Sequence, residues 1–131
     1  MDFEIPDELH YSTDDEWVLP EDDFVTLGVT DFAQLQLGDI VYVELPSVGD
    51  SIAKGQAFGV IESVKAVSDL NAPVTGEVVA INEKLLDQPE IINEECYGDG
   101  WIVKIKLANE DEIKSLLDAD KYRKLVSERS A

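Results

Sequence analysis

The sequence predicts a mainly β domain that ends in helices, on three observations. Short runs rich in β-branched and aromatic residues alternate with glycine and polar turn residues up to about position 107. Residues 109–128 instead carry apolar side chains at helical spacing. With 131 residues, 44% of them hydrophobic, the chain is long enough for one domain with a buried core.

Polar turns divide the first part of the chain into short elements. Strands at 16–19 and 24–29 are joined by the polar turn 20–23, which predicts a hairpin. Thr30 is a suitable N-cap for a short helix that Gly38 ends. This helix and the strand after it are predicted at 31–35 and 40–45.

Lys65 stands between two strand-like segments in the middle of the chain, 57–61 before it and 70–74 after it. A cation at the tip of a two-stranded hairpin cannot serve to stabilise a core. Held on a rigid turn, its amine is accessible to acylation, which removes the charge of a lysine. Lys65 is therefore predicted to be an attachment point.

Residues 48–52 and 74–78 resemble each other weakly on the two sides of this lysine. Similar strand-and-turn units on both flanks would give two related halves that meet at Lys65. So short a similarity also arises by chance, and the sequence leaves both interpretations open.

The last part of the chain is predicted to hold one helical turn, an irregular stretch, a strand and a helical segment. Asn109 is the predicted N-cap of that segment, and Glu112 completes an approximate capping box. Two apolar faces, separated by a break at 118–120, are expected to pack on the β domain, with partner binding as the alternative. The helical turn is predicted at 82–86, the irregular stretch after Pro89 and the strand at 101–107. The first apolar face consists of Ile113, Leu116 and Leu117, and the second of Tyr122, Leu125 and Val126.

Acidic residues far outnumber basic ones, since 29 Asp and Glu against 10 Lys and Arg give a net charge of −19. This charge argues against nucleic-acid binding, which needs clustered Lys and Arg, and against anionic membrane surfaces. It favours attraction to positively charged protein partners, or it serves only to keep the protein dispersed.

The chain has one cysteine, Cys96, and one histidine, His10. These numbers permit no internal disulfide, no cysteine-based metal cluster and no multi-histidine metal site. Nothing supports a Cys–His catalytic pair, so no enzyme activity is expected. The N-terminus lacks the features of a signal peptide, and no segment reaches membrane-spanning length. A soluble, cytoplasmic protein is expected.

A set of motifs, in order and at matching spacing, resembles the H protein of the glycine cleavage system, a lipoyl carrier. The similarity extends from Ile5 to the C-terminal helix, and the ordered set is far more specific than Val-Lys-Ala around Lys65 alone. The motifs stand at 9–11, 16–18, 28–34, 37–39, 43–46, 58–69, 72–78 and 97–101.

The resemblance implies a lipoyl/biotinyl-type barrel-sandwich hybrid with short N-terminal elements and C-terminal helices. It implies a single lipoyl-carrier domain over 1–131, with a core at about 11–107 and the helical segment at 109–128. Lys65 would carry lipoic acid in amide linkage. The implied partners are a pyridoxal-phosphate-dependent glycine decarboxylase, which loads an aminomethyl group, an aminomethyltransferase, which receives it, dihydrolipoyl dehydrogenase and the lipoylating enzymes.

The resemblance also implies a cleft for the loaded aminomethyl arm. Glu16, Asp69 and Asp14 map to that cleft, where carboxylates would hold an ammonium group and shelter it from water. In so acidic a chain, each is otherwise a solvated surface charge. Glu62 maps to a position that lipoylating enzymes read, and an exposed strand-end charge is its alternative.

Two positions depart from the family pattern. Asp15 stands where the family usually has histidine, and Cys96 where it usually has proline. Asp15 adds negative charge beside the predicted cleft, whereas Cys96 removes a restriction on the preceding backbone.

Two other carrier functions are alternatives to glycine cleavage. An H-protein-like lipoyl carrier, or a lipoyl donor to other acceptors, is hardly separable by sequence. A biotinyl domain is disfavoured, because biotinylated lysines typically sit between methionines and here Val64 and Ala66 flank the lysine.

Overall fold

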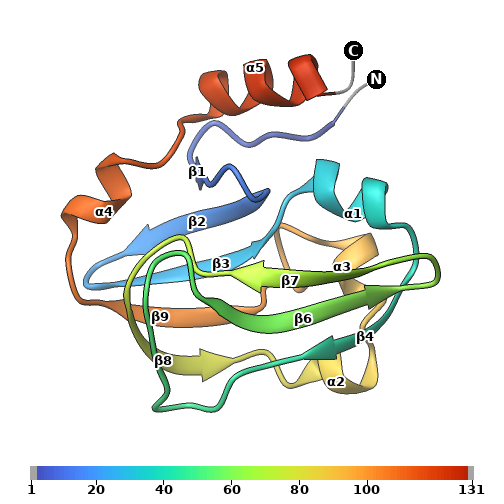
Figure 1. The fold of residues 1–131 in the computed structure, drawn as a ribbon, viewed down its shortest axis with the longest axis horizontal. Coiled ribbons are helices and arrows are strands. Elements are labelled where there is room, and N and C mark those ends of the chain that lie inside the picture. Colours follow the sequence, from blue (N-terminus) through green and yellow to red (C-terminus); the bar gives the residue numbers. More distant parts are fainter. Residues whose placement is uncertain (1–2, 130–131) are drawn as a thin grey trace.

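The computed structural model describes residues 3–129, which form two antiparallel β-sheets with helices at their margins (Figure 1). The larger sheet has the strand order β1-β2-β3-β9-β8-β5, and the smaller has the order β4-β6-β7. The mainly β fold with C-terminal helices is thus confirmed. The strands are β1 (His10–Tyr11), β2 (Glu16–Glu21), β3 (Phe24–Val29), β4 (Ile40–Glu44), β5 (Ser51–Ile52), β6 (Ala57–Ser63), β7 (Val67–Asn71), β8 (Gly76–Ile81) and β9 (Val103–Leu107). The helices are α1 (Asp31–Leu37), α2 (Lys84–Asp87), α3 (Ile91–Glu94), α4 (Asp111–Lys114) and α5 (Ala119–Arg129).

β2 and β3 form the predicted hairpin, but its turn is shorter than 20–23. Pro20 and Glu21 continue β2 and pair with β3, so only Asp22 and Asp23 join the strands. Pro20 is tolerated there because β1 is too short to reach it, which leaves β2 an edge strand at that point. Asp22 has φ of 54°, a left-handed conformation that aspartate adopts more readily than most residues.

The short helix α1 has the two predicted caps, Thr30 and Gly38, but it extends to Leu37, two residues past the predicted 31–35. The hydroxyl of Thr30 accepts a hydrogen bond from the backbone nitrogen of Ala33 at 3.2 Å. Gly38 ends the helix with φ of 85°, where glycine is favoured. This helix faces the hairpin that carries Lys65, on the right of Figure 1.

The two weakly similar segments on either side of that hairpin lie next to each other. Ser51 pairs with Glu77 and Ile52 with Gly76, so β5 and β8 join the hairpin base to the larger sheet. Gly76 admits no side chain, because a Cβ there would lie 2.1 Å from the backbone oxygen of Lys106. Close approach of the β8 backbone at Gly76 to the β9 backbone at Lys106 therefore anchors the segment that follows the hairpin.

Helix α3 lies where the sequence predicted an irregular stretch. Its Asn93 accepts a hydrogen bond from the backbone nitrogen of Ile40 at 2.9 Å and donates to the backbone oxygen of Gly38 at 2.9 Å. One amide side chain thus replaces missing backbone partners between α1 and β4. A role of this kind leaves no periodic pattern in the sequence.

A break in the helical segment exists, but it lies at 115–118, since Ala119 and Asp120 already belong to α5; the predicted capping box is wrong. Glu112 accepts hydrogen bonds from the backbone nitrogen and the hydroxyl of Thr75, at 2.7 and 2.9 Å, and so ties α4 to the start of β8. Asp118 begins α5, because its carboxylate accepts from the backbone nitrogen of Lys121 at 2.8 Å.

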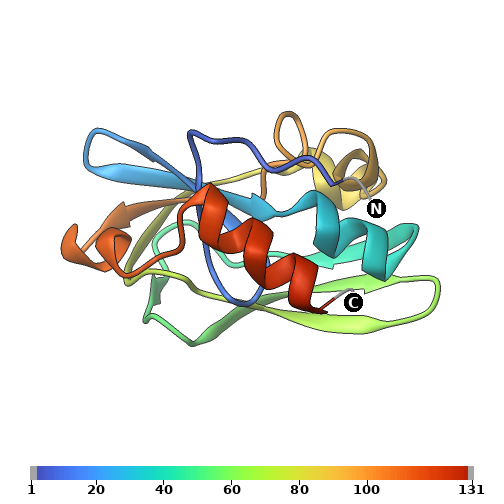
Figure 2. The same ribbon diagram turned by 90° about the horizontal axis from the view of Figure 1, so that it is seen from above.

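The C-terminal apolar faces pack on the rest of the protein, as predicted. Ile113 and Leu116 join the main core, which lies between the two sheets. Helix α5 covers a second, smaller core with the N-terminal segment, and Figure 2 shows it lying beside α1. The rings of Tyr11 and Tyr122 stack in that core, with centroids 4.6 Å apart.

Gly28 provides a test of how closely these layers pack. Gly28→Ala should lower the free energy of unfolding by about 2 kcal/mol, the usual cost of overpacking, because the new Cβ would lie 2.5 Å from Nε1 of Trp17. That indole cannot move away easily, since it donates to the backbone oxygen of Cys96 at 2.9 Å. Chemical denaturation measures the difference.

Gly98→Ala is the matched control for this substitution. Its Cβ would lie 3.4 Å from the nearest atom, a carboxylate oxygen of Glu95, so the change should stay within about 0.5 kcal/mol. Equal losses in the two variants would contradict the packing argument.

Candidate functional site

Lys65 lies at the tip of the hairpin formed by β6 and β7 (Figure 1). The backbone nitrogen of Ser63 donates to the backbone oxygen of Ala66 at 2.8 Å, and the hydroxyl of Ser63 accepts from the nitrogen of Ala66 at 3.0 Å. The nitrogen of Val64 donates to the backbone oxygen of Asp39 at 3.0 Å. The turn is therefore fixed both internally and to the segment after α1.

The side chain of Lys65 is exposed, as are its neighbours Val64 and Ala66. Within residues 3–129, no carboxylate forms an ion pair with it. Its Cε lies 3.5 Å from where a Cβ of Gly38 would be, so the aliphatic stem runs past the end of α1. The amine is thus accessible, beside a helix that also lines the groove described next.

A groove of about 170 Å³ lies between α1, the hairpin and the loop before β2. It brings together three of the acidic residues that the sequence singled out, Asp14, Glu16 and Asp69. Its other lining residues come mainly from α1 and the hairpin, and they are Asp15, Val29, Ala33, Gln36, Leu37, Ile61, Ser68 and Leu70. Lys65 and these carboxylates therefore belong to one region of the surface.

Glu16 is the buried member of this group, with only 3% of its surface exposed. One carboxyl oxygen accepts a hydrogen bond from the hydroxyl of Ser12 at 3.0 Å, and the other accepts from the backbone nitrogen of Asn71 at 3.0 Å. Asn71 ends β7, so Glu16 joins the larger sheet to the hairpin strand. Asp14 and Asp69 are exposed.

Burial raises the pKa of the Glu16 carboxyl from 4.5 to about 8. The hydrogen bonds from Ser12 and Asn71 oppose this rise, whereas the negative charges of Asp14 and Asp15 add to it. Glu16 is therefore mostly protonated near neutral pH while no cation is close to it. A cation placed beside such a carboxyl favours its ionised form, so the carboxyl loses its proton and becomes negatively charged.

Asp15 also lines the groove, but its carboxylate pairs with the C-terminal helix, which the sequence did not predict. Its φ is 66°, and its carboxylate accepts hydrogen bonds from both terminal nitrogens of Arg129, at 2.6 and 2.9 Å. The extra negative charge at this departure from the family pattern is therefore paired. An acidic residue 114 positions away from its arginine gives no sequence signal of that pairing.

Cys96, the second departure, takes part in packing. Its backbone oxygen accepts from Trp17, and burial raises the pKa of its thiol to about 12. A thiol with so high a pKa is a poor nucleophile.

Glu62 lies on β6, outside the groove. It is half-buried and pairs with Tyr42 of β4 on one side and Val67 of β7 on the other. Glu62 is three residues before Lys65, so a protein that contacts the hairpin tip meets it on the same small sheet.

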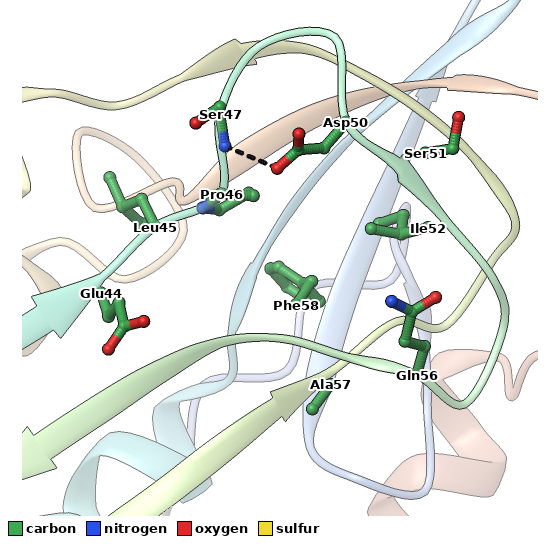
Figure 3. A pocket seen from close by; sticks show the side chains of 10 residues that line it. All are labelled: Glu44, Leu45, Pro46, Ser47, Asp50, Ser51, Ile52, Gln56, Ala57 and Phe58. Atoms are coloured by element: carbon green, nitrogen blue, oxygen red, sulfur yellow. Dashed lines mark hydrogen bonds between the residues drawn. The ribbon is translucent and has the colours of Figure 1, made fainter.

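A larger hollow, of about 450 Å³, lies near the opposite end of β6, where Ala57 and Phe58 begin the strand (Figure 3). Asp50 points toward the backbone nitrogen of Ser47 and accepts its hydrogen bond at 3.0 Å, which closes the loop on one side. None of the predicted site residues lines this hollow. It is lined by the end of β4, the loop to β5, β5 itself and the start of β6.

In residues 3–129, no cluster of His, Cys, Asp and Glu has an arrangement that holds a metal ion. Over the same residues, none of the helices combines the length and apolar character needed to span a bilayer.

A small two-sheet domain that presents a lysine on a rigid hairpin tip, beside an acidic groove, has the architecture expected of a carrier domain. The sequence profile described as Glycine cleavage H-protein matches residues 9–129. The chain belongs to the glycine cleavage H-protein family, and the family and fold expected from the sequence are confirmed.

Relatives and a solved structure agree with this membership. A probable glycine cleavage system H protein of Natronomonas pharaonis is 54% identical over 127 residues, 97% of this chain and 100% of the relative. The glycine cleavage system H protein of Carboxydothermus hydrogenoformans is 49% identical, over 95% of each chain. The crystal structure of such a protein from Mycobacterium marinum superposes with a TM-score of 0.83 at 37% identity, covering 92% of this chain and 97% of that one.

The raised pKa of Glu16 predicts a pH-dependent stability. The folded state holds this proton more tightly than the unfolded state, so the free energy of unfolding should fall as pH rises from 4.5 to about 8. Glu16→Gln should remove that contribution, which amounts to a few kcal/mol at about 1.4 kcal/mol per pKa unit. Denaturation curves across this pH interval measure it.

Glu83→Gln is the control, because Glu83 is exposed and makes no side-chain capping bond. Its pH profile should match that of the unsubstituted protein. If Glu16→Gln keeps the full decline with pH, Glu16 is not the titrating group.

Proposed function

We propose that this chain is a lipoylated carrier of the glycine cleavage system, acting in the cytoplasm, with lipoic acid attached by an amide bond to Lys65. The observation that supports this most is the accessible lysine on a fixed turn, beside an acidic groove, in a member of this family. The chain itself carries out no catalysis in this proposal. Residues 1–131 act as one carrier domain, with a core at about 11–107 and the helical segment 109–128.

The residues around Lys65 fit a lipoyl group. Its amine has no competing ion pair in residues 3–129, and its stem passes α1, which lines the groove. When bound, the lipoyl group would supply a disulfide that is reduced as it accepts an aminomethyl group from glycine decarboxylase, and that dihydrolipoyl dehydrogenase would restore after aminomethyltransferase has received the group. Everything else the protein contributes is attachment, orientation and shelter.

The groove provides the shelter for a cationic amine. Asp69 and Asp14 are at its surface and attract the cation, while the buried Glu16 offers an acceptor removed from water. An ammonium beside Glu16 favours its ionised form, so binding would release a proton from a group whose pKa is about 8 in the empty groove. Ser12 and Asn71 keep the carboxyl in place in both forms.

The surface around Lys65 suits recognition by lipoylating enzymes and by the partners. Val64, Val67 and Tyr42 are exposed apolar side chains close to the lysine, and Glu62 lies among them on the same small sheet. A net charge of −19 would steer the carrier toward partners with basic surfaces. Glu62 is the residue we assign to reading by lipoylating enzymes.

Intact-mass spectrometry tests the attachment site. Incubation with a lipoylating enzyme should add the mass of one lipoyl group to the unsubstituted protein and none to Lys65→Arg, because an arginine cannot form the amide. Lys54→Arg is the matched control, since Lys54 is also an exposed turn lysine, bonded to Ser115 at 2.7 Å. It should be modified normally.

Two outcomes would count against this proposal. Modification of Lys65→Arg would move the attachment site elsewhere. Failure of the lipoylated protein to support glycine-dependent bicarbonate exchange with an active decarboxylase would favour a lipoyl donor to other acceptors.

The groove residues predict how long the loaded group survives. Asp69→Asn and Glu16→Gln should each shorten the half-life of the bound aminomethyl group on the order of tenfold, about the worth of one charge-assisted hydrogen bond. The rate of ammonia release from the isolated, loaded protein measures this. Asp87→Asn, an exposed carboxylate at the end of α2, should leave the half-life unchanged.

A further inference from the structure

A network of hydrogen bonds joins the C-terminal helix to the loop that carries the groove carboxylates. Arg129 in the last turn of α5 donates to both oxygens of Asp15, at 2.6 and 2.9 Å. The hydroxyl of Tyr122, on the same helix, donates to the same carboxylate at 3.0 Å. The carboxylate therefore receives three donors from one helix.

The same network extends to α1, the opposite wall of the groove. The hydroxyls of Tyr122 and Thr30 lie 2.7 Å apart, and that of Thr30 caps α1 by accepting from Ala33. The backbone nitrogen of Thr30 donates to the backbone oxygen of Asp15 at 3.0 Å. The guanidinium of Arg129 also lies over the ring of Phe32 on α1, 5.3 Å from its centroid.

The backbone of Asp15 shows why this network matters for the groove. With φ of 66°, Asp15 is in the left-handed region, which costs a residue with a side chain some free energy and persists only where its surroundings fix it. This conformation brings the Asp15 carboxylate to Arg129 and Tyr122 of α5, although Asp15 lines the groove together with Asp14 and Glu16. The contacts of Asp15 with α5 and with the backbone nitrogen of Thr30 therefore hold the middle residue of the loop 14–16.

Burial distinguishes this pair from an ordinary surface ion pair. The Asp15 side chain is 15% exposed, whereas Asp120, which pairs with Arg123 on the same helix, is 91% exposed. Exposed pairs contribute little, because water screens them. A bidentate arginine–carboxylate pair that is partly removed from water contributes more to stability and fixes the relative orientation of the two side chains.

We propose that Arg129 is a positioning residue for the groove: together with Tyr122 it holds Asp15, and so keeps the loop 14–16 in the arrangement that receives a cationic amine. Arg129 also neutralises Asp15, so that the negative charge presented to the amine comes from Asp14 and Asp69, and from Glu16 once the amine has ionised it. This inference rests on the proposed function of the groove as the shelter of an aminomethyl group.

Amide hydrogen exchange of the unmodified protein tests the positioning directly. Arg129→Met should speed the exchange of the Thr30 and Asn71 backbone amides on the order of tenfold, because these amides donate to Asp15 and Glu16 in the held loop. Arg129→Lys should restore part of the protection, since lysine keeps the charge but loses the second donor. Arg123→Met on the same helix is the matched control and should leave both amides unchanged.

The loaded protein provides the second readout. Arg129→Met should shorten the half-life of the aminomethyl group several-fold, and Arg123→Met should not. In Asp15→Asn, further substitution of Arg129 by Met should add little, because the two residues act as one unit.

The outcomes separate the two proposals. If Arg129→Met matches Arg123→Met in both readouts, the positioning role is wrong, whatever the groove does. If Arg129→Met loosens the amides but leaves the half-life unchanged while Asp69→Asn shortens it, Arg129 only stabilises the fold and the inference is overturned. If neither Asp69→Asn nor Glu16→Gln shortens the half-life, the shelter function fails instead.

Discussion

The arrangement of the groove depends on one buried carboxyl group, that of Glu16. It accepts a hydrogen bond from the end of β7 and another from Ser12, and so it ties the hairpin that carries Lys65 to the larger sheet. A buried acid is costly as an anion, which is why its pKa rises to about 8. The carboxyl that joins the hairpin to the larger sheet is therefore also the one that we propose as an acceptor for a cationic amine.

Lys65 is held at the hairpin tip by a small number of hydrogen bonds in and around the turn. The turn 64–66 contains no glycine, and the hydroxyl of Ser63 takes the place of a backbone acceptor for Ala66. The bond between Val64 and Asp39 adds an external restraint. A hairpin tip that is fixed in this way would lose little conformational entropy on binding to another protein, so the entropic cost of recognition is small.

The fold class, the hairpin with Lys65 and the helix caps at Thr30 and Gly38 were predictable, because local patterns of turn residues and apolar runs determine them. The misassignments have physical reasons. Pro20 sits in a strand because its neighbour β1 is short, and Glu112 bonds to Thr75 where a capping box was expected. The groove residues followed from family motifs alone, whereas the pairing of Asp15 with Arg129 joins distant positions and leaves no local signal.

The position of β9 has a consequence for how the chain matures. This strand lies between β3 and β8, yet it is the last strand in sequence. During synthesis β1, β2 and β3 are made well before β9, so β3 has no pairing partner on its β9 side until residue 107 has been added. The two parts of the larger sheet, β1-β2-β3 and β8-β5, therefore join only after β9 has been made, so the sheet that supports the β6–β7 hairpin is completed late in biosynthesis.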